Sequence, residues 1–543
     1  MRRSSSHTGG VSGRRFDLAA HAACAVADTV RGVRMPSMPA PDRSWTAIRR
    51  GLAALVLLLL PGVLYLGTIT EHYGLRDDYS ILREAHEEPG KVTGWCASQG
   101  RPLYGLVLEA TFGELEGLDD LPLARALTAV AVGVVSLLGW AAFRRAGWTA
   151  TGSFAFAALL SVLPAAQIDV SWAVCFPHVL AAVAGMAAFL VADAERWRRR
   201  AGGAVLVACG ALFYQPHALL YVAPVAAGLV ARRHEPVAAR ARWLAVHLTV
   251  LASGLVLAFA VMQALFASGL AAPSHLWAFD LDPLAKLRWF LDQPLHNALA
   301  LIVLRDETRD PSTAYWCMVA GVAAAIAVAV VGELRRGGVR AAAFLVLCVA
   351  GLAIASFAAN LIAEERTPKY RTLWALGAVC TAFAAQGLAT LGDALPKHVG
   401  RHLATAAIAA LALAGVPLAR SQTYELIAEP QERELALVEQ SLRLPLLRDD
   451  PSMFVIRPRP GDTIAPLRFE DEFGSLSSDS DWVPTEMLKA VIEERAPSLC
   501  DAPRPCRITT GLSVPPGARY DLVIDLRNLT GLRPRAEGSS RPG

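Results

Sequence analysis

Charged side chains are scarce in this chain of 543 residues. Lys, Arg, Asp and Glu make up 18% of it and hydrophobic residues 54%, whereas a soluble globular domain carries about a quarter charged residues. The mean hydropathy, +0.38, is correspondingly high. An ordinary soluble protein is therefore excluded. The net charge of +4 is small and gives no indication of a nucleic-acid partner.

Cysteines are few and unevenly placed. Five lie in apolar runs, where cysteine behaves as a small hydrophobe: Cys175, Cys209, Cys317, Cys348 and Cys380. Cys500 and Cys506 stand in the polar tail as CDAPRPC. No second Cys or His pair lies nearby, which argues against a metal site there. A disulfide is expected if the tail is extracytoplasmic.

Long apolar runs dominate the rest of the chain. Runs of about 20 apolar residues can cross a hydrocarbon core, and we expect eleven: about 51–70, 122–143, 149–166, 171–193, 202–216, 217–231, 243–270, 312–332, 341–362, 370–391 and 402–419. The fifth and sixth are short and meet at Gln215-Pro216-His217, so they could instead form a re-entrant hairpin. The sequence predicts an all-α polytopic membrane protein.

Short arginine clusters alternate with these runs. They are Arg49-Arg50, Arg144-Arg145, Arg196 with Arg198–Arg200, Arg232-Arg233 with Arg240 and Arg242, and Arg335-Arg336 with Arg340. All fall on one side of the predicted spans, which the positive-inside rule makes cytoplasmic. The stretches 71–121, 271–311, 363–369 and the tail from about 420 onward are then outside.

This topology gives three predicted regions. Residues 1–48 are a basic, disordered cytoplasmic extension, and 49–419 form the transmembrane domain with its outer loop 71–121. Residues 420–543 form a small extracytoplasmic α/β domain. Its strand-like runs are MFVIR and YDLVIDL, with a helical stretch near Thr485–Glu494.

The first outer loop begins EHYGLRDDYS and holds two adjacent carboxylates, Asp77 and Asp78. A carboxylate can accept the proton of an attacking hydroxyl where burial or a neighbouring carboxylate raises its pKa towards neutrality. The alternative is that Asp78 caps a short helix, SILREAHEE, and that Asp77 is solvated.

Cations also gather on the predicted outer side. The stretch EERTPKYR holds Arg366, Lys369 and Arg371, which suit a lipid-linked phosphate because arginine can bind it through two parallel hydrogen bonds. The alternative is that they are interfacial residues reaching lipid headgroups. Arg101, in GWCASQGRPLYG, could share this role or pair with the acidic pair and lower its pKa.

Ionisable residues within or beside the spans are functional candidates by default. His178 in CFPHV, His217 in QPHAL and Asp169 in QIDVSW are in this position. The alternative is a neutral histidine that bonds to another helix beside a proline. Asp471 and Asp479 in the tail are predicted to be surface residues.

Four short motifs together resemble the GtrII-like glucosyltransferases of the GT-C superfamily. They are the acidic pair after the first span, Gly100-Arg101 some twenty residues later, Tyr214-Gln215 in FYQPH, and the tail element DEFGSLSSDSDW at 471–482. The resemblance covers roughly residues 50–490. It implies a GT-C-like fold and a polyprenyl-phosphate-linked sugar donor used at the extracytoplasmic face of a bacterial inner membrane.

The implied reaction moves a hexose to a cell-envelope glycan or lipid-linked acceptor, as in surface polysaccharide or O-antigen modification. The resemblance gives the base role to Asp77 or Asp78. The expected phosphate-binding residues are Arg101, Arg366, Lys369 and Arg371, and the expected substrate-binding residues are Tyr214, Gln215, His217 and His178. Some GT-C enzymes use a metal and others do not, so Mg²⁺ or Mn²⁺ is left open.

Other classes remain as alternatives. A polysaccharide polymerase or ligase would concentrate its function in one large mid-chain outer loop. A flippase or transporter would more often show internal repeats or charges deep within its spans, and the chain shows neither clearly. A membrane anchor for the tail is a further alternative. No Gly-rich nucleotide-binding loop is found between a strand and a helix.

Overall fold

The computed structural model describes residues 43–274, 277–306, 310–366, 369–443, 451–459, 469, 471–500, 506–527 and 529. Contacts divide the chain into two compact units, Met1–Ala53 and Ala54–Gly543. The predicted N-terminal extension, 1–48, lies almost wholly outside the described residues. The described helices and strands belong to the second unit, apart from the start of the first helix.

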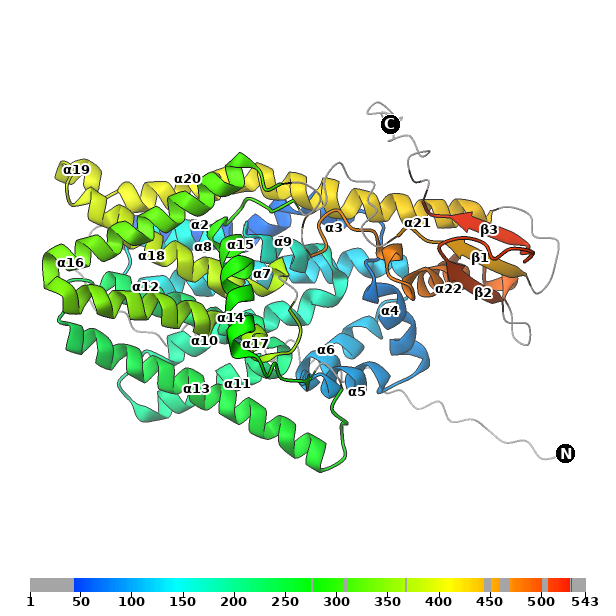
Figure 1. Ribbon diagram of the computed structural model, residues 1–543, viewed down its shortest axis with the longest axis horizontal. Coiled ribbons are helices and arrows are strands. Elements are labelled where there is room, and N and C mark those ends of the chain that lie inside the picture. The colour runs from blue at the N-terminus through cyan, green and yellow to red at the C-terminus, as the bar shows by residue number, and fades with distance from the viewer. Residues whose placement is uncertain are drawn as a thin grey trace. The chain divides into compact units, whose positions relative to one another are not determined.

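The described chain is mostly helical (Figure 1). Its α-helices are α2 (Arg43–Leu64), α3 (Leu66–Thr70), α4 (Asp77–Glu87), α5 (Lys91–Ser98), α6 (Pro102–Phe112), α7 (Leu121–Arg145), α8 (Ala150–Leu160), α9 (Pro164–Ser171), α10 (Phe176–Ala192), α11 (Trp197–Ala218), α12 (Val222–Ala231), α13 (Val237–Ala267), α14 (Pro283–Asp292), α15 (Pro294–Leu299), α16 (Thr313–Ser356), α17 (Ala358–Ile362), α18 (Trp374–Gly392), α19 (Lys397–Gly400), α20 (Leu403–Thr423), α21 (Glu429–Leu442) and α22 (Val483–Arg495).

Among the described residues, seven helical stretches are long and apolar enough to cross a membrane, or eight if the bent pair α8 and α9 is one span. The predicted count of eleven is not confirmed. The predicted spans 202–216 and 217–231 fall within the continuous stretch Trp197–Ala231. The predicted spans 312–332 and 341–362 overlap the continuous stretch Thr313–Ser356, and the second also includes α17. The first predicted span, 51–70, is divided between α2 and α3 and is not among the seven.

Both continuous stretches contain a break. Within α16 the backbone of Gly338 adopts φ +69°, and within α11 Tyr214 adopts φ −158° and ψ 109°. A straight helix of 44 residues would be about 66 Å long at 1.5 Å per residue, about twice the thickness of a hydrocarbon core. The break in α11 lies one residue before the predicted Gln215-Pro216-His217 junction.

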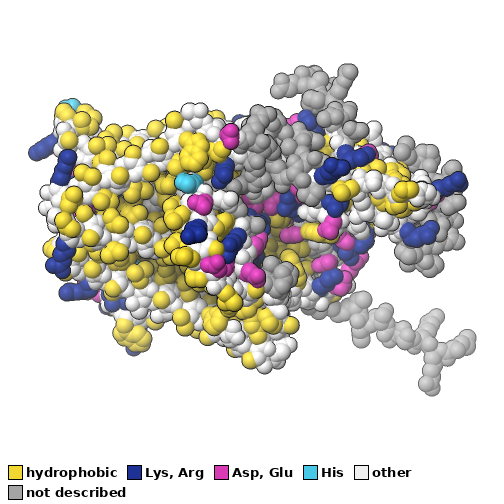
Figure 2. Space-filling view, viewed as in Figure 1, with side chains coloured by type: hydrophobic (Ala, Val, Ile, Leu, Met, Phe, Trp, Pro, Cys, Tyr) yellow, Lys and Arg dark blue, Asp and Glu magenta, His cyan; other side chains and the backbone are white. Residues whose placement is uncertain are grey.

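Several long helices leave apolar side chains uncovered. In the most apolar 18-residue window of α13, and likewise of α16, only 28% of the residues are buried. On α13, Val256 and Phe259 are exposed, and on α16 Leu347 is exposed. Figure 2 shows hydrophobic side chains over much of this surface. Such continuous apolar surface is compatible with a lipid environment rather than with water.

Arginines from three of the basic clusters form ion pairs with two aspartates near the ends of the helices. Arg145 pairs with Asp193 at 3.0 Å, and Arg233 and Arg336 both pair with Asp393, at 3.1 and 3.0 Å. These ion pairs lie at the C-terminal ends of α7, α10, α12 and α18 and near the Gly338 break within α16. The Arg232 guanidinium, which donates to the Ala146 carbonyl at 3.2 Å, connects the two sets of pairs. Arginines from three of the clusters that the sequence assigns to one membrane side therefore lie near one another.

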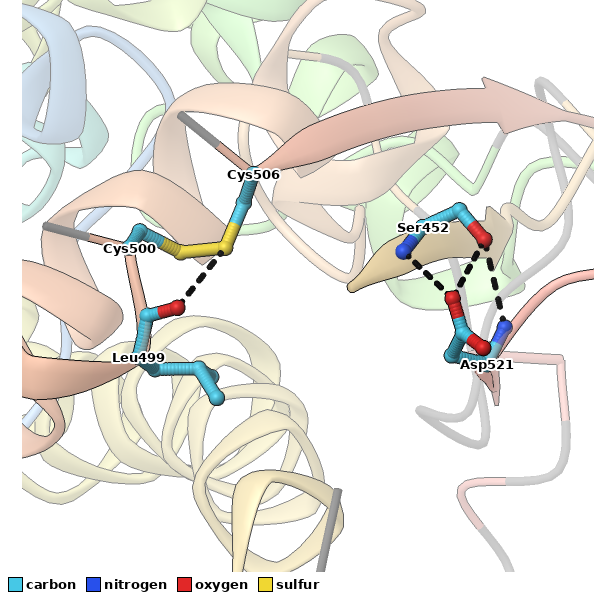
Figure 3. The surroundings of a disulfide bond; sticks show 5 residues. All are labelled: Ser452, Leu499, Cys500, Cys506 and Asp521. Atoms are coloured by element: carbon cyan, nitrogen blue, oxygen red, sulfur yellow. Dashed lines mark hydrogen bonds between the residues drawn. A yellow bond between two sulfur atoms is a disulfide. The ribbon is translucent and has the colours of Figure 1, made fainter. Parts of the chain in front are cut away.

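The C-terminal part contains the predicted strands and helix. Strands β1 (Ser452–Ile456), β2 (Arg507–Gly511) and β3 (Leu522–Asp525) form a parallel sheet in the order β2-β1-β3. Phe454 of β1 lies opposite Thr509 of β2 and Val523 of β3. The sequence predicts β1, β3 and α22 but not β2. Close to this sheet, Cys500 and Cys506 form a disulfide with their Cα atoms 5.1 Å apart (Figure 3).

Candidate functional site

A cavity of about 490 Å³ lies between the first outer loop, the middle helices and the segment before α18. Its polar lining includes five residues that the sequence singles out from three distant segments: Asp77, Arg101, His178, Lys369 and Arg371. Tyr214 and Gln215 also line it. The structure thus brings most of the predicted site residues to one place.

Asp77 and Asp78 have different surroundings although they are adjacent. Asp77, the first residue of α4, is partly buried and lines the cavity. No hydrogen bond or ion pair within 4 Å engages its carboxylate among the described residues. Burial raises the pKa of Asp77, an effect that the Arg371 guanidinium opposes and the Glu472 carboxylate increases. A partly buried carboxylate with a raised pKa facing a cavity can act as a general base.

Asp78 is fully buried and does not line the cavity. The backbone amide of Leu75 donates to its Oδ2 at 2.8 Å, and that of Val174 donates to its Oδ1 at 3.0 Å. Burial raises the pKa of Asp78 to about 7, against the effect of these hydrogen bonds. Its carboxylate therefore joins the first outer loop to the segment before α10. It does not accept from the α4 backbone amides, as the predicted helix cap would.

Arg101 stands immediately before α6 and lines the cavity. Its guanidinium lies 4.9 Å from the centre of the Tyr214 ring, and its buried Nε has no hydrogen-bond partner. In the described part of the chain no carboxylate lies within 4 Å of it. The alternative of a pair with Asp77 or Asp78 is therefore not seen, and the charge of Arg101 is available to an anion in the cavity.

The preceding glycine explains how Arg101 reaches this position. Gly100 adopts φ +83°, and a Cβ at this residue would overlap the Trp277 ring. The amide of Gln215 donates from Nε2 to the Gly100 carbonyl at 3.0 Å. Gln215 thus holds the Gly-Arg turn as well as lining the cavity.

Lys369 and Arg371 both line the cavity but have acidic partners. Lys369 pairs with the exposed Glu365 at 3.1 Å. Arg371 lies 3.7 Å from Glu472 and 4.9 Å from the centre of the Trp172 ring. In the ranges that the structure describes, each cation has a single carboxylate partner within 4 Å, so both can still contribute positive potential to the cavity.

Arg366 does not line the cavity. Its guanidinium pairs with Asp280 at 2.8 Å and is 40% exposed. Lys286 contacts the backbone of the segment that carries Arg366. Its Nζ donates to the carbonyls of Ala363 and Glu365, both at 2.6 Å. Arg366 therefore helps to hold the 363–366 segment against the loop before α14, in contrast to the predicted phosphate contact.

The two histidines also differ. His178 lines the cavity with its ring stacked on Tyr214, at 3.8 Å between centroids, and on Tyr104, at 4.9 Å. His217 does not line the cavity; it is fully buried, and its Nε2 lies 2.6 Å from Asp169 Oδ2. The position of His217 therefore favours a helix-joining contact over direct substrate contact.

One group of residues could hold a metal. The ligand atoms of Asp169, Cys175 and His178 all lie within 4.8 Å of one another, and Asp169 Oδ1 and His178 Nδ1 have no hydrogen-bond partner. A thiol and an imidazole are not the oxygen ligands that Mg²⁺ requires, and Mn²⁺ also prefers oxygen ligands. These residues therefore do not fit Mg²⁺ or Mn²⁺.

The tail segment 471–479 contacts Arg371, one of the residues that line the cavity. The sequence predicts Asp471 and Asp479 on the surface, and this is wrong: Asp479 is 7% exposed and Asp471 is partly buried. Asp479 lies 3.5 Å from Arg76, and Asp471 Oδ2 accepts from the Arg371 amide at 3.2 Å. An ion pair thus compensates the burial of Asp479, and a hydrogen bond from a backbone amide compensates the partial burial of Asp471.

The other part of the cavity is apolar. It is lined by Leu255, Ala258, Phe259 and Met262 of α13 and by Ala358, Ala359 and Ile362 of α17. Phe259 and Ile362 are also exposed at the surface, 47% and 55%. The cavity therefore opens between α13 and α17 onto the uncovered apolar face of the helices.

Several lining residues were not singled out in the sequence. Trp95, Tyr104 and Trp172 contribute aromatic surface, and Arg76 and Glu472 form ion pairs just outside the lining. Aromatic residues are common near membrane interfaces, so their type alone does not mark them. A comparison with family models and with curated proteins finds no match for this chain.

Proposed function

We propose that this chain is a membrane glycosyltransferase that moves a hexose from a polyprenyl-phosphate-linked donor to a cell-envelope glycan or lipid-linked acceptor. The observation that carries the proposal is one cavity that combines the Asp77 carboxylate, which is unpaired among the described residues, three cations, of which Lys369 pairs with the lining residue Glu365, and an apolar opening. A lipid-linked sugar phosphate has three parts that complement them. Its sugar lies at the bond where the base acts, its phosphate is an anion for the cations, and its long apolar chain suits the apolar opening.

The two ends of the cavity fit the two ends of such a donor. The exposed apolar opening between α13 and α17 suits the polyprenyl chain. Arg101, Lys369 and Arg371 suit the phosphate, with Arg101 first because no carboxylate in the described part of the chain neutralises it. The aromatic rings of Trp172, Tyr104 and Tyr214 suit a sugar ring placed between them and Asp77.

The reaction proceeds in line at the anomeric carbon. Asp77 takes the proton of the acceptor hydroxyl as its oxygen forms the new bond to that carbon. The bond between the carbon and the phosphate oxygen breaks, and the lipid phosphate leaves with the electron pair. Arg101, Lys369 and Arg371 stabilise the charge that develops on it. The configuration at the anomeric carbon is inverted.

The proposal includes a GT-C-like membrane domain with eleven crossings. The breaks at Gly338 and Tyr214 divide the two continuous stretches into four crossings, and α2 with α3 adds another. The arginine-rich end is then cytoplasmic and the cavity extracytoplasmic, in a bacterial inner membrane. The C-terminal sheet lies on the same side as the cavity.

A transfer assay tests this proposal. Membranes containing the full chain are given a polyprenyl-phosphate hexose labelled in the sugar, and release of label from the lipid fraction to acceptor is measured. We expect Asp77→Asn to lower kcat about 100-fold or more, since a general base contributes about 10²–10⁴. Glu114→Gln, an exposed acid of the same loop, is the matched control and should retain the wild-type rate.

Asp78→Asn separates the two carboxylates. It should lower the unfolding temperature, because Leu75 and Val174 donate to different carboxylate oxygens and the amide nitrogen that replaces one of them cannot accept a hydrogen bond. Wild-type turnover in the Asp77→Asn variant would rule out the proposed base. If the wild type binds the donor and moves it across the membrane without transferring the sugar, a flippase is the correct class.

A further inference from the structure

The tail segment 471–479 is polar in sequence yet almost wholly buried. Glu472, Ser475, Ser477 and Ser478 are each 1% exposed or less, and Phe473 is fully buried against Tyr370, with ring centroids 5.9 Å apart. Burying this many polar side chains is costly unless each is bonded. Their bonds therefore indicate what the segment holds in place.

Glu472 joins two segments that both reach the cavity. Its Oε2 lies 3.1 Å from Arg76 Nε, and its Oε1 lies 3.3 Å from Arg76 Nη1 and 3.7 Å from Arg371 Nη1. Arg76 immediately precedes Asp77, and Arg371 lines the cavity. One carboxylate thus connects the segment of the proposed base to the segment of a proposed phosphate-binding cation.

The rest of the segment is fixed to the last long helix. Gln431 of α21 donates from Nε2 to the Ser475 carbonyl at 2.7 Å and accepts at Oε1 from the Ser477 hydroxyl at 2.6 Å. The Gly474 amide donates to the Leu426 carbonyl at 2.6 Å. The backbone next to Glu472 is therefore held in place by hydrogen bonds to Gln431 and Leu426.

We propose that Glu472 is a positioning residue of the cavity, which sets Arg371 and the Asp77 segment at a fixed separation by forming ion pairs with Arg371 and Arg76 together. The proposal rests on the function proposed above, because it assigns Asp77 and Arg371 their roles. It gives the C-terminal part a direct role in the chemistry, beyond that of a separate appended domain.

Electrostatics provides a way to observe this coupling. Among the charged groups near Asp77, Arg371, Arg76 and Lys369 lower its pKa and Glu472 raises it. The adjacent Asp78 carboxylate also interacts with Asp77 and is unchanged in the variants compared below. Removing the charge of Glu472 removes this acidic contribution and leaves the Arg76 and Arg371 guanidiniums less neutralised, with Asp479 still beside Arg76 and Asp471 still acting on Arg371. Both changes lower the pH at which Asp77 loses its proton.

The experiment labels the full chain in membranes with dicyclohexylcarbodiimide, which reacts with protonated carboxyl groups, and locates the product by peptide mass spectrometry. The pH midpoint of labelling at Asp77 is compared in wild type, Glu472→Gln and Glu486→Gln. Glu486 is the matched control, because it joins α22 to α4 through Arg83 at 2.6 Å and does not line the cavity.

We expect Glu472→Gln to move the Asp77 midpoint down by about half a pH unit or more and Glu486→Gln to leave it unchanged. Glu472→Asp keeps the charge on a shorter side chain and should give a smaller shift in the same direction, which also serves if the glutamine variant does not fold. An unchanged midpoint in both Glu472 variants, or equal shifts in the Glu472 and Glu486 variants, would overturn the proposal.

A kinetic arm separates the two proposals. If transfer is measurable, Glu472→Gln should lower kcat about tenfold with little change in KM, because misplaced groups act mainly on the transition state. If the wild type shows no transfer at all, the function proposed above fails. The labelling midpoints still report whether Glu472 positions the cavity.

Discussion

Arg101 and Arg366 carry the same charge, and the sequence predicts that both bind the donor phosphate. Their partners in the structure differ. Arg101 lines the cavity without an acidic partner among the described residues, whereas Arg366 pairs with Asp280 outside it. We expect Arg101→Gln to raise the Kd for a polyprenyl phosphate about tenfold or more, the value of one charged hydrogen bond. Binding measured in detergent or nanodiscs checks this.

Arg366→Gln is the matched control for that measurement. It should leave the Kd within about twofold, since its guanidinium is already neutralised and exposed. Equal losses of affinity in the two variants would contradict the assignment of Arg101 as the first phosphate contact.

The raised pKa of Asp77 gives the proposed reaction a pH dependence. A base acts only when it has lost its proton, and burial moves that loss upward from the ordinary value near 3.8. The rate of transfer should therefore rise as pH increases through the raised pKa and then level off. Measuring kcat/KM from about pH 4 to 8 tests this; a rate that falls with rising pH across the acidic limb would show that Asp77 acts in its protonated form or not at all.

At the scale of elements, the close packing of α16 against α18 depends on a glycine. A Cβ at Gly387 of α18 would overlap the Ala325 carbonyl of α16. Gly387→Ala should therefore destabilise the protein by about 1–3 kcal/mol through overpacking and lower its unfolding temperature in detergent.

Gly351 of α16 provides the comparison. A Cβ there meets nothing within 4 Å, so Gly351→Ala should be neutral or stabilising by about 0.5–1 kcal/mol, the helix preference for alanine. Similar melting temperatures for the two variants would show that α16 and α18 can move apart at Gly387 with no loss of stability.

Element positions could be predicted from the sequence where local pattern decides them. Apolar length gives the long helices, and alternation gives β1 and β3. The short β2 carries the residues RITTG, which lack a clear apolar alternation, and it was missed. The break at Tyr214 lies one residue from the junction that the sequence predicts at Gln215-Pro216-His217.

The candidate site could be predicted only in part. The acidic pair and the outer cations were found from residue type and spacing, but Asp77 and Asp78 could not be separated. Their difference arises from backbone amides of Leu75 and Val174, the second nearly a hundred residues away. The Glu472 contact with Arg76 links residues 396 positions apart, and no local pattern contains it.

At the scale of the whole molecule, the two ends have opposite character. Within Ala54–Gly543, Arg145, Arg233 and Arg336 from three of the arginine clusters lie at one end with Asp193 and Asp393, and the cavity with the tail segment lies at the other. The proposed topology predicts that Glu116→Cys reacts with a membrane-impermeant maleimide in intact spheroplasts, whereas Arg199→Cys reacts only after permeabilisation. Both positions are exposed.

The background for this labelling is the full chain with the exposed Cys317 replaced by serine. Reaction of both positions in intact spheroplasts, or the reverse pattern, would show that the orientation read from the arginines is incorrect.

The contact between Glu472 and Arg76 also has a consequence for biosynthesis. A ribosome adds about 5–20 residues per second, so the first outer loop exists for some tens of seconds before residue 472 is made. During that interval Arg76 and Arg371 have no Glu472 to bind. The cavity therefore acquires its final form only when synthesis is nearly complete, and a premature stop codon before position 472 would leave an inserted helical protein without a finished site.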